Sequence, residues 1–318
     1  MPDPVPHDIR VLADERARAR RARDWATADR LKAELASAGW DVVDAATLYT
    51  LERRPAAVVE VDGEVRYGAS DAVPSRLGEA PAVGATAVLV ADDVAGVLPR
   101  SVAALLAHSA GTQVIVVAND PSEAVAADVA GLPRGVEVVR LAPRLGAAAA
   151  RNAGIRRASC GVVVLLSPRL VAEGDVIAAL AAPLDDPEVA VAGVGGLTTA
   201  DLVHFAPTLP GVTRTAAVDL RAMAFRREDY IARGPLDEHF TTDAYLDAWW
   251  AFALRDVPGD ADVHAVPRRA AVVAAPFTML GDDAAPPDER LAKKHRYRFL
   301  KWFASRRDLL VSAGVSAE

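Results

Sequence analysis

The stretch RLGAAAARNAGIRRA, residues Arg144–Ala158, decides the fold of this chain. It follows a short run rich in β-branched residues, Val136–Leu141, and precedes another, Val162–Leu166. We therefore predict a strand, a helix over Gly146–Ala158 and a second strand. Two strands joined by a helical crossover lie parallel in one sheet.

The same alternation of strand and helix extends over the chain from residue 84 onward. Predicted strands at Ala85–Val90 and Gln113–Val117 precede the quoted stretch, with predicted helices at Leu98–His108 and Glu123–Ala130. This alternation is typical of an α/β fold in which helices flank a mostly parallel sheet.

The beginning of the chain has a different pattern. Residues 8–23 and 25–38 are rich in helix formers, and Gly39 follows as a helix stop. These two segments predict a helical hairpin. Short strands are expected after it, among them a β-hairpin over Ala57–Tyr67.

A change of composition marks the predicted domain boundary. The stretch Ser70–Val83 contains several helix and strand breakers and no hydrophobic periodicity. We therefore predict a helical hairpin with a small β element over residues 1–69, a linker over 70–83 and the α/β domain over 84–318.

Composition and charge limit the classes of protein to which the chain can belong. Of its 318 residues 52% are apolar and 25% are charged, which excludes disorder as the main state. No apolar run approaches the length of a membrane span, and the first residues do not resemble a secretion signal, so we expect a cytoplasmic protein. The net charge of −7 argues against a general polyanion binder.

Cysteine and histidine are too sparse to suggest a metal site. The single cysteine, Cys160, excludes an internal disulfide and is expected to be buried and inert. His239 and His264 have no ligand-like spacing, so no zinc site is predicted.

The quoted stretch closely resembles the N-L-G-x-x-x-A-R-N-x-G segment of family 2 glycosyltransferases, which are inverting enzymes of the GT-A fold with nucleotide-sugar donors. Further segments resemble the family in its own order, over roughly residues 84–275: Ala87–Leu106, Val114–Ser122, Val162–Val171, Val218–Phe240 and Tyr245–Arg255. The resemblance implies a GT-A fold, a nucleotide-sugar donor and an acceptor hydroxyl.

The resemblance also implies site residues, but the family's metal-binding aspartates fall on Ser167 and Arg169. Neither side chain can act as a carboxylate ligand, so no metal site and no cofactor are expected, although relatives use a divalent metal. The family's catalytic aspartate falls on Asp247, the candidate general base.

Other candidate donor-binding residues follow from the same comparison. The family's base-contacting aspartate falls on Ala118, where Asn119 or Asp120 could replace it. Three further candidates have structural alternatives: Asp92 as a loop cap, and Arg151 and Asn152 as residues that tie down the helix start.

Two explanations of the altered donor site stay open at this point. In the first, the domain has kept a GT-A scaffold and lost transfer activity, and it acts as a binding module for a protein or RNA partner. In the second, the Arg169 side chain supplies the positive charge that a metal would bring to the diphosphate, which gives a metal-independent transferase.

The N-terminal hairpin resembles a different family. The run Leu12–Ala45 is similar to the C-terminal helical segment of cysteinyl-tRNA synthetases, with matches that include Glu15, Arg16, Asp24 and Gly39. The synthetase's nucleotide-binding fold and zinc ligands are absent from the sequence, so aminoacylation is excluded. Residues 1–54 carry ten basic and ten acidic side chains, which favours a stabilising or dimerising helix pair, and hence a homo-oligomer, over an RNA contact.

The end of the chain, Asp288–Leu310, is predicted to be a helix in which apolar residues alternate with eight lysines and arginines. We interpret it as a closing helix with a solvated basic face. Peripheral attachment to the inner face of a membrane is the alternative, because aromatic and basic side chains mix in it.

Overall fold

The structure is a computed structural model that describes residues 5–22, 24–45, 48–53, 57–61, 63–91, 94–208, 213–256, 266–281 and 288–310. The chain divides into two compact units, Met1–Val59 and Glu60–Glu318. The division lies ahead of the linker predicted at 70–83. The boundary falls before residue 64 because the strand at Glu64–Tyr67 joins the large sheet of the second unit.

The first unit contains the predicted helix pair and a two-stranded sheet. Helix α1 (His7–Arg21) packs against α2 (Trp25–Ser37), and the carboxylate of Asp24 caps α2 by accepting a hydrogen bond from the Thr27 amide at 3.1 Å. Strands β1 (Trp40–Ala45) and β2 (Leu48–Arg53) pair antiparallel. A small core contains Ile9, Ala13, Leu35 and Trp40.

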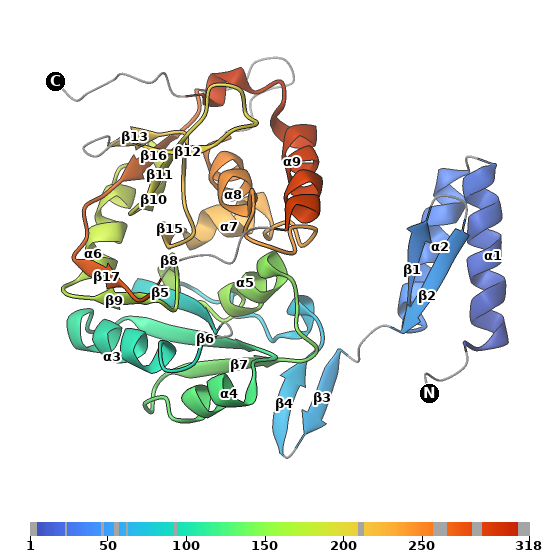
Figure 1. The fold of residues 1–318 in the computed structure, drawn as a ribbon, viewed down its shortest axis with the longest axis horizontal. Helices are drawn as coiled ribbons and strands as arrows, with labels where there is room; N and C mark the ends of the chain where they lie inside the picture. The colour runs from blue at the N-terminus through green and yellow to red at the C-terminus, as the bar shows by residue number, and fades with distance from the viewer. Residues whose placement is uncertain are drawn as a thin grey trace. The chain divides into compact units, whose positions relative to one another are not determined.

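A ten-stranded sheet forms the centre of the second unit (Figure 1). Its order is β13-β16-β10-β15-β8-β5-β6-β7-β4-β3. The strands are β3 (Val58–Val61), β4 (Glu64–Tyr67), β5 (Ala82–Ala91), β6 (Gln113–Asn119), β7 (Glu137–Leu141), β8 (Cys160–Leu166), β10 (Val189–Gly193), β13 (Arg214–Thr215), β15 (Ala222–Arg226) and β16 (Arg269–Val272).

Most neighbours in this sheet are parallel, as predicted. Strand β5 pairs parallel with β6 and β8, and β6 pairs parallel with β7. Strand β15 is antiparallel to both of its neighbours, β8 and β10. The predicted β-hairpin over residues 57–67 corresponds to β3 and β4, which extend the sheet at one edge because Tyr67 pairs with Leu141.

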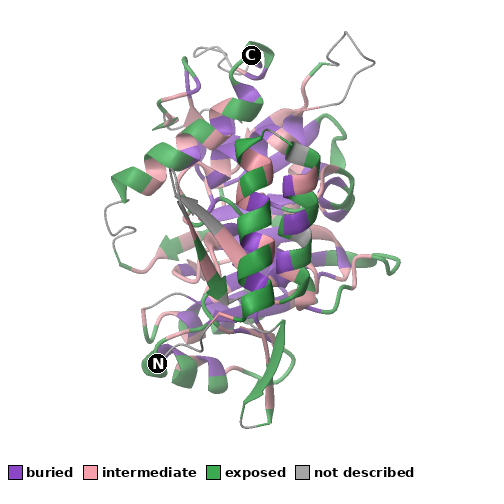
Figure 2. Ribbon diagram, turned by 90° about the vertical axis from the view of Figure 1, so that its right-hand side faces the viewer, coloured by how far each residue is buried: buried purple, intermediate pink, exposed green. Residues whose placement is uncertain are grey.

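Helices cover both faces of the sheet, and alternate residues of the central strands face two separate cores. Val88 of β5 belongs to the core on which helices α5 (Ala147–Ile155), α7 (Arg227–Arg233), α8 (Leu246–Arg255) and α9 (Glu289–Phe303) pack. Its neighbours Ala87 and Leu89 face the core under α3 (Leu98–His108), α4 (Glu123–Ala130) and α6 (Val176–Ala181). Figure 2 shows buried residues concentrated in the strands and on the inner sides of the helices. The predicted mostly parallel α/β fold is confirmed.

Short elements complete the second unit. They are β9 (Leu170–Ala172) paired with β17 (Phe277–Met279), a small sheet of β11 (Gly196–Thr198), β12 (Ala206–Pro207) and β14 (Ala217–Val218), and the 3-10 helices η1 (Ser70–Ala72), η2 (Ala182–Asp185) and η3 (Arg307–Leu309).

The closing helix, predicted to extend to Leu310, is shorter in the structure. Helix α9 ends at Phe303, and the 3-10 helix η3 follows it. Its inner side buries His295, Phe299 and Phe303, while Tyr297 and Trp302 are more than half exposed. Within the described ranges, none of the helices combines the length and apolar character needed to cross a membrane. Cys160 is buried at the start of β8, as predicted.

Helix α5 approaches the sheet closely because Gly154 faces it. A Cβ atom at Gly154 would lie 2.4 Å from Cγ1 of Val88 and 2.8 Å from Cγ2 of Val117. Both contacts are shorter than real carbon contacts, so only glycine allows this separation between the helix and the strands β5 and β6.

We expect Gly154→Ala to lower the free energy of unfolding by about 1–3 kcal/mol, because the clash exceeds the roughly 1 kcal/mol that alanine contributes to a helix. Urea unfolding followed by circular dichroism measures the change. Gly161→Ala in β8 is the matched control, since its Cβ would meet nothing closer than 4.0 Å. Equal stability of the two variants would contradict the close approach of α5.

Candidate functional site

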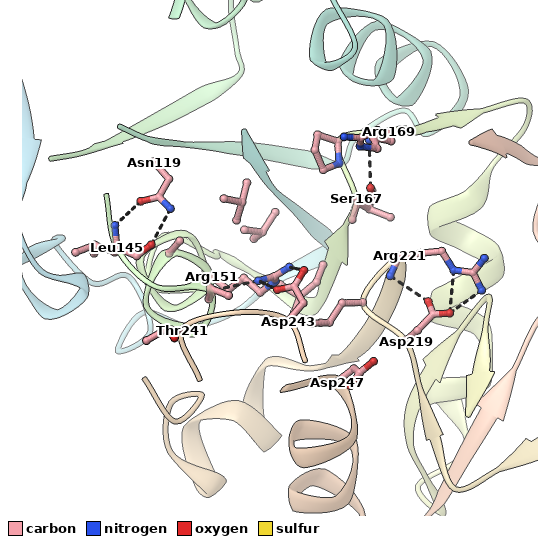
Figure 3. Close-up of a pocket in the computed structure, with 18 of the residues that line it drawn as sticks. Asn119, Leu145, Arg151, Ser167, Arg169, Asp219, Arg221, Thr241, Asp243 and Asp247 are labelled. Carbon is pink, nitrogen blue, oxygen red and sulfur yellow. Dashed lines mark hydrogen bonds and ion pairs between the residues drawn. The ribbon is translucent and has the colours of Figure 1, made fainter. Parts of the chain in front are cut away.

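A cavity of about 440 Å³ lies where the parallel strands β5, β6 and β8 end (Figure 3). Val90, Asn119 and Leu166, near the carboxyl ends of these strands, contribute to its wall. Crevices at this edge of an open α/β sheet are the usual ligand sites of such folds. Seven charged residues line the cavity: Arg144, Arg151, Arg169, Arg221, Asp219, Asp243 and Asp247.

The loop before α5 is held in place by Asn119. The side-chain amide of Asn119 donates to the Leu145 carbonyl at 3.0 Å and accepts from the Leu145 amide at 2.8 Å. The side chain is buried, and this double contact occupies both ends of its amide group. Asn119, predicted to contact the donor base, therefore lies in the cavity wall with its amide engaged by Leu145.

The first backbone amides of α5 are hydrogen-bonded to carbonyl groups of another segment. The amides of Ala147 and Ala148 donate to the carbonyls of Thr241 and Phe240 at 3.0 and 3.1 Å. A Cβ on Gly146, the residue before the helix, would lie 3.0 Å from the Thr241 Cα. These helix-end amides, which could otherwise bind an anion, are thus satisfied within the protein.

Arg151 and Asp243 form a two-pronged ion pair on one side of the cavity. The Nη1 and Nη2 atoms of Arg151 donate to Oδ1 and Oδ2 of Asp243 at 2.7 and 3.1 Å. The Arg151 side chain is mostly buried, whereas Asp243 is exposed. The pair ties α5 to the segment that leads into α8.

Asn152, the neighbour of Arg151, points away from the cavity into the core. Its amide donates to the Leu236 carbonyl and to Glu238, and accepts from the Leu236 amide and the Tyr230 hydroxyl, at 2.8 to 3.0 Å. It does not line the cavity. The structural alternative stated for Asn152 agrees with these contacts.

Ser167 and Arg169 lie just beyond β8, where the cavity opens. The Ser167 hydroxyl accepts from the Arg169 amide at 3.3 Å, and the Ser167 amide donates to the Arg221 carbonyl at 2.8 Å. A Cβ at Gly281 would come within 3.3 Å of Nη1 of Arg169, so Gly281 leaves room beside the guanidinium group.

A second arginine–aspartate pair, which sequence reasoning missed, lies across the cavity. Arg221 donates through Nε and Nη2 to Oδ2 of Asp219 at 2.8 and 2.6 Å. Both side chains pack over Gly195, where a Cβ would lie 2.0 Å from the Asp219 carboxylate. Only the position of these residues, in the segment resembling the acceptor side of the family, pointed to them.

Asp247 is in the first turn of α8, and its side chain reaches the side of the cavity where Asp219 and Arg221 lie (Figure 3). Burial, together with the negative charges of Asp243 and Asp219, raises the pKa of Asp247 to about 7. The hydrogen bond from the Ala248 amide and the charge of Arg151 oppose this shift of the pKa without reversing it.

The acidic side chains of the cavity do not form a cluster of metal ligands. Among the residues that the structure describes, no three His, Cys, Asp or Glu side chains are grouped as metal ligands. Asp219 and Asp243 are each engaged by an arginine, and Ser167 and Arg169 stand at the positions that the resemblance assigns to a metal.

Two other predicted site residues lie elsewhere. Asp92 is outside the described residues. Asp120 has a left-handed backbone with φ of 46° and lines a separate cavity of about 170 Å³ beside α4. That cavity shares no residue with the one that contains Asp247.

His295 of α9 is a further residue that sequence reasoning missed. It is fully buried, its Nε2 accepts a hydrogen bond from the Thr241 amide at 3.2 Å, and its Nδ1 lies 3.1 Å from the Ala244 carbonyl. Burial lowers the pKa of His295, which favours the neutral ring that the acceptor role of Nε2 needs. Helix α9 thereby holds the loop that closes the start of α5.

Comparison with known proteins agrees with this geometry. Residues 87–229, less than half of the chain, match the model of Glycosyl transferase family 2. The crystal structure of GalNAc-T7 with UDP, GalNAc and Mn²⁺ is similar over 70% of this chain and 51% of that chain, with a TM-score of 0.54 and 14% identity. The likeness confirms the predicted GT-A-like fold, and the family match confirms the predicted resemblance to family 2.

Other matches are more limited. The mannosyltransferase PcManGT from Pyrobaculum calidifontis, in complex with GDP-Man and Mn²⁺, covers 74% of this chain and 78% of its own with a TM-score of 0.45 and 15% identity. Cysteine--tRNA ligase of Opitutus terrae is 46% identical over 48 residues, and cysteine--tRNA ligase 1 of Burkholderia lata is 52% identical over 40. The two ligase matches confirm the resemblance of the N-terminal segment to cysteinyl-tRNA synthetases. The chain spans a tenth or less of the length of these two ligases.

The raised pKa of Asp247 predicts a pH-dependent stability. Because the folded protein holds this proton up to about pH 7 and the unfolded chain releases it near pH 4, the contribution of Asp247 to stability falls as the pH rises between these values. We expect Asp247→Asn to be more stable than the parent by roughly 2 kcal/mol at pH 8.5 and by less at pH 5. The value is smaller than the full pKa shift implies, because solvent in the open cavity screens the charge.

Urea unfolding of parent and variant at the two pH values measures this difference. The exposed Asp71→Asn is the control for a substitution outside the cavity. A gain in stability that is the same at pH 5 and pH 8.5 would argue against a protonated Asp247.

Proposed function

We propose that the second unit is a glycosyltransferase that transfers a sugar from a nucleotide-sugar donor to an acceptor hydroxyl in a single, inverting displacement. The observation that carries the proposal is the presence, in one cavity, of a partly buried carboxyl group whose pKa is about 7 and of arginine side chains that include Arg169 beyond the end of β8. The match of residues 87–229 to family 2 supports the same class of reaction.

Arg169 is the proposed partner of the donor's diphosphate. The four arginines and three aspartates of the cavity leave a positive balance, which increases by one charge when Asp247 is protonated. A guanidinium group donates two parallel hydrogen bonds to phosphate oxygens and stays charged at any physiological pH. It can therefore stabilise the charge on the departing nucleoside diphosphate without a metal ion.

Asp247 is the proposed general base. A base works best when its pKa lies near the working pH, because it is then largely ionised and still accepts a proton readily. The Asp247 carboxylate would take the proton of the acceptor hydroxyl as that oxygen attacks the sugar. The nucleoside diphosphate leaves with the bonding electrons on the opposite face of the sugar.

Donor binding is the first test of this proposal. Calorimetric titration with UDP, GDP, UDP-glucose and GDP-mannose, each with Mn²⁺ and with excess chelator, should show one ligand pair whose binding survives the chelator. Arg169→Ala should weaken that binding about 10- to 100-fold, the range expected for a lost charged hydrogen bond of about 1.5–3 kcal/mol.

Arg100→Ala in α3 is the control for donor binding, because Arg100 is exposed and does not line the cavity. Binding that disappears in chelator would contradict the metal-independent site. If none of the four ligands binds measurably to the folded protein, the alternative is favoured, a GT-A scaffold that binds a partner without catalysis.

Transfer activity gives a separate test of Asp247. With the donor identified, kcat/KM should rise about tenfold per pH unit below pH 7 and level off above it, because only the ionised Asp247 acts as a base. Asp247→Asn should lose nearly all transfer while donor binding persists. Full turnover by this variant would remove Asp247 from the mechanism.

A further inference from the structure

A further cavity, of about 210 Å³, lies between the strands β13 and β16 and the C-terminal end of α8. It shares no residue with the cavity that contains Asp247. Strand β13 is the outermost strand at the end of the large sheet opposite β3 (Figure 1). Four arginines and one aspartate line the cavity: Arg214, Arg255, Arg268, Arg269 and Asp308.

Arg255 is a buried cation in this wall. It is the last residue of α8 and only 4% exposed. Its Nε donates to the Arg268 carbonyl at 2.9 Å and its Nη1 to the Ala216 carbonyl at 2.5 Å. Over the described part of the chain, Nη2 has no hydrogen-bond partner and Arg255 forms no ion pair with a carboxylate.

The burial of this charge is compensated only in part by its neighbours, among them the Phe252 ring, whose centroid lies 5.5 Å from Cζ of Arg255. Burial lowers the pKa of Arg255 to about 10, and the charge of Arg214 acts in the same direction, while Asp308 opposes it. The negative end of the α8 dipole and the carbonyl contacts offset part of the cost. A buried guanidinium group without a counter-ion stays costly, and an anion beside it would remove that cost.

The carboxylates near this cavity are already engaged by other arginines. Arg268 donates to both carboxylate oxygens of Asp229 at 3.0 and 2.7 Å, and Arg269 is paired with Asp186. Asp308 accepts from Nε and Nη2 of Arg306 at 3.0 and 2.8 Å. None of these acids forms an ion pair with Arg255, and only the charge of Asp308 acts on it from a distance.

Arg214 supplies a second charge at the rim. It lies on β13, where Arg214 pairs with Ala271 of β16, and it is exposed. No ion pair or hydrogen bond of its side chain to any described residue is present. A buried arginine beside an exposed one is an arrangement that suits a tetrahedral oxyanion, because each guanidinium group can donate two parallel hydrogen bonds.

We propose that this cavity is a binding site for a phosphate group, held between Arg255 and Arg214 and separate from the donor cavity. Its volume admits inorganic phosphate or the phosphate of a small monoester. The proposal rests on the geometry of this cavity alone and does not depend on the proposed transferase activity.

Thermal unfolding and hydrogen exchange of the full chain test the site with inorganic phosphate as the probe. Phosphate, added against chloride at constant ionic strength, should raise the Tm and slow amide exchange in residues 214–216 and 268–271. Glycerol 3-phosphate tested in parallel distinguishes the source, since tighter binding than that of phosphate identifies a monoester. An unchanged Tm and unchanged exchange at 20 mM phosphate would overturn the proposal.

Variants separate this site from the arginines of the donor cavity. Arg214→Gln, at an exposed position, should raise the half-saturating phosphate concentration at least tenfold, and Arg255→Lys should do the same if it folds. Arg169→Ala and the exposed control Arg100→Gln should leave the exchange protection at 214–216 in place. Protection that survives Arg214→Gln and disappears in Arg169→Ala would place phosphate in the donor cavity and overturn the second site.

Discussion

Two backbone hydrogen bonds at the start of α5 join the two halves of the candidate site. The carbonyls of Phe240 and Thr241 accept from the first two amides of the helix, and the rest of the cavity is arranged around that junction. On one side, Asn119 pins the preceding loop to the end of β6. On the other, His295 of α9 holds the Thr241 amide, so a helix near the end of the chain supports the cavity wall.

This junction also determines where charge can be placed. Since the amides of Ala147 and Ala148 are occupied by carbonyl groups, these two amides do not bind an anion in the cavity. Arg151 and Arg221 are paired with Asp243 and Asp219, which makes them part of the wall. The other two arginines of the cavity lie on different sides of it, Arg144 in the loop before α5 and Arg169 beyond the end of β8.

Sequence reasoning placed the strands and helices of the second unit well, because each has a strong hydrophobic period and clear breakers. The resemblance assigned Asp247 and Arg169 to one site, and both side chains line the same cavity. Sequence reasoning could not distinguish the roles of Arg151 and Asn152, which are adjacent in the motif. One faces the cavity and the other is enclosed by Tyr230, Leu236 and Glu238, and only the direction of each side chain on α5 decides this.

The sequence by itself determined the alternation of strand and helix, the resemblance of its two parts to different families, and the presence of Ser167 and Arg169 at positions where the resemblance implies carboxylates, because these properties reside in local pattern and residue identity. Only the tertiary structure decided which aspartates are engaged by arginines, how far the pKa of Asp247 rises, and that β4 belongs to the large sheet. These properties depend on burial and on contacts between residues tens of positions apart, and no local pattern records either of them.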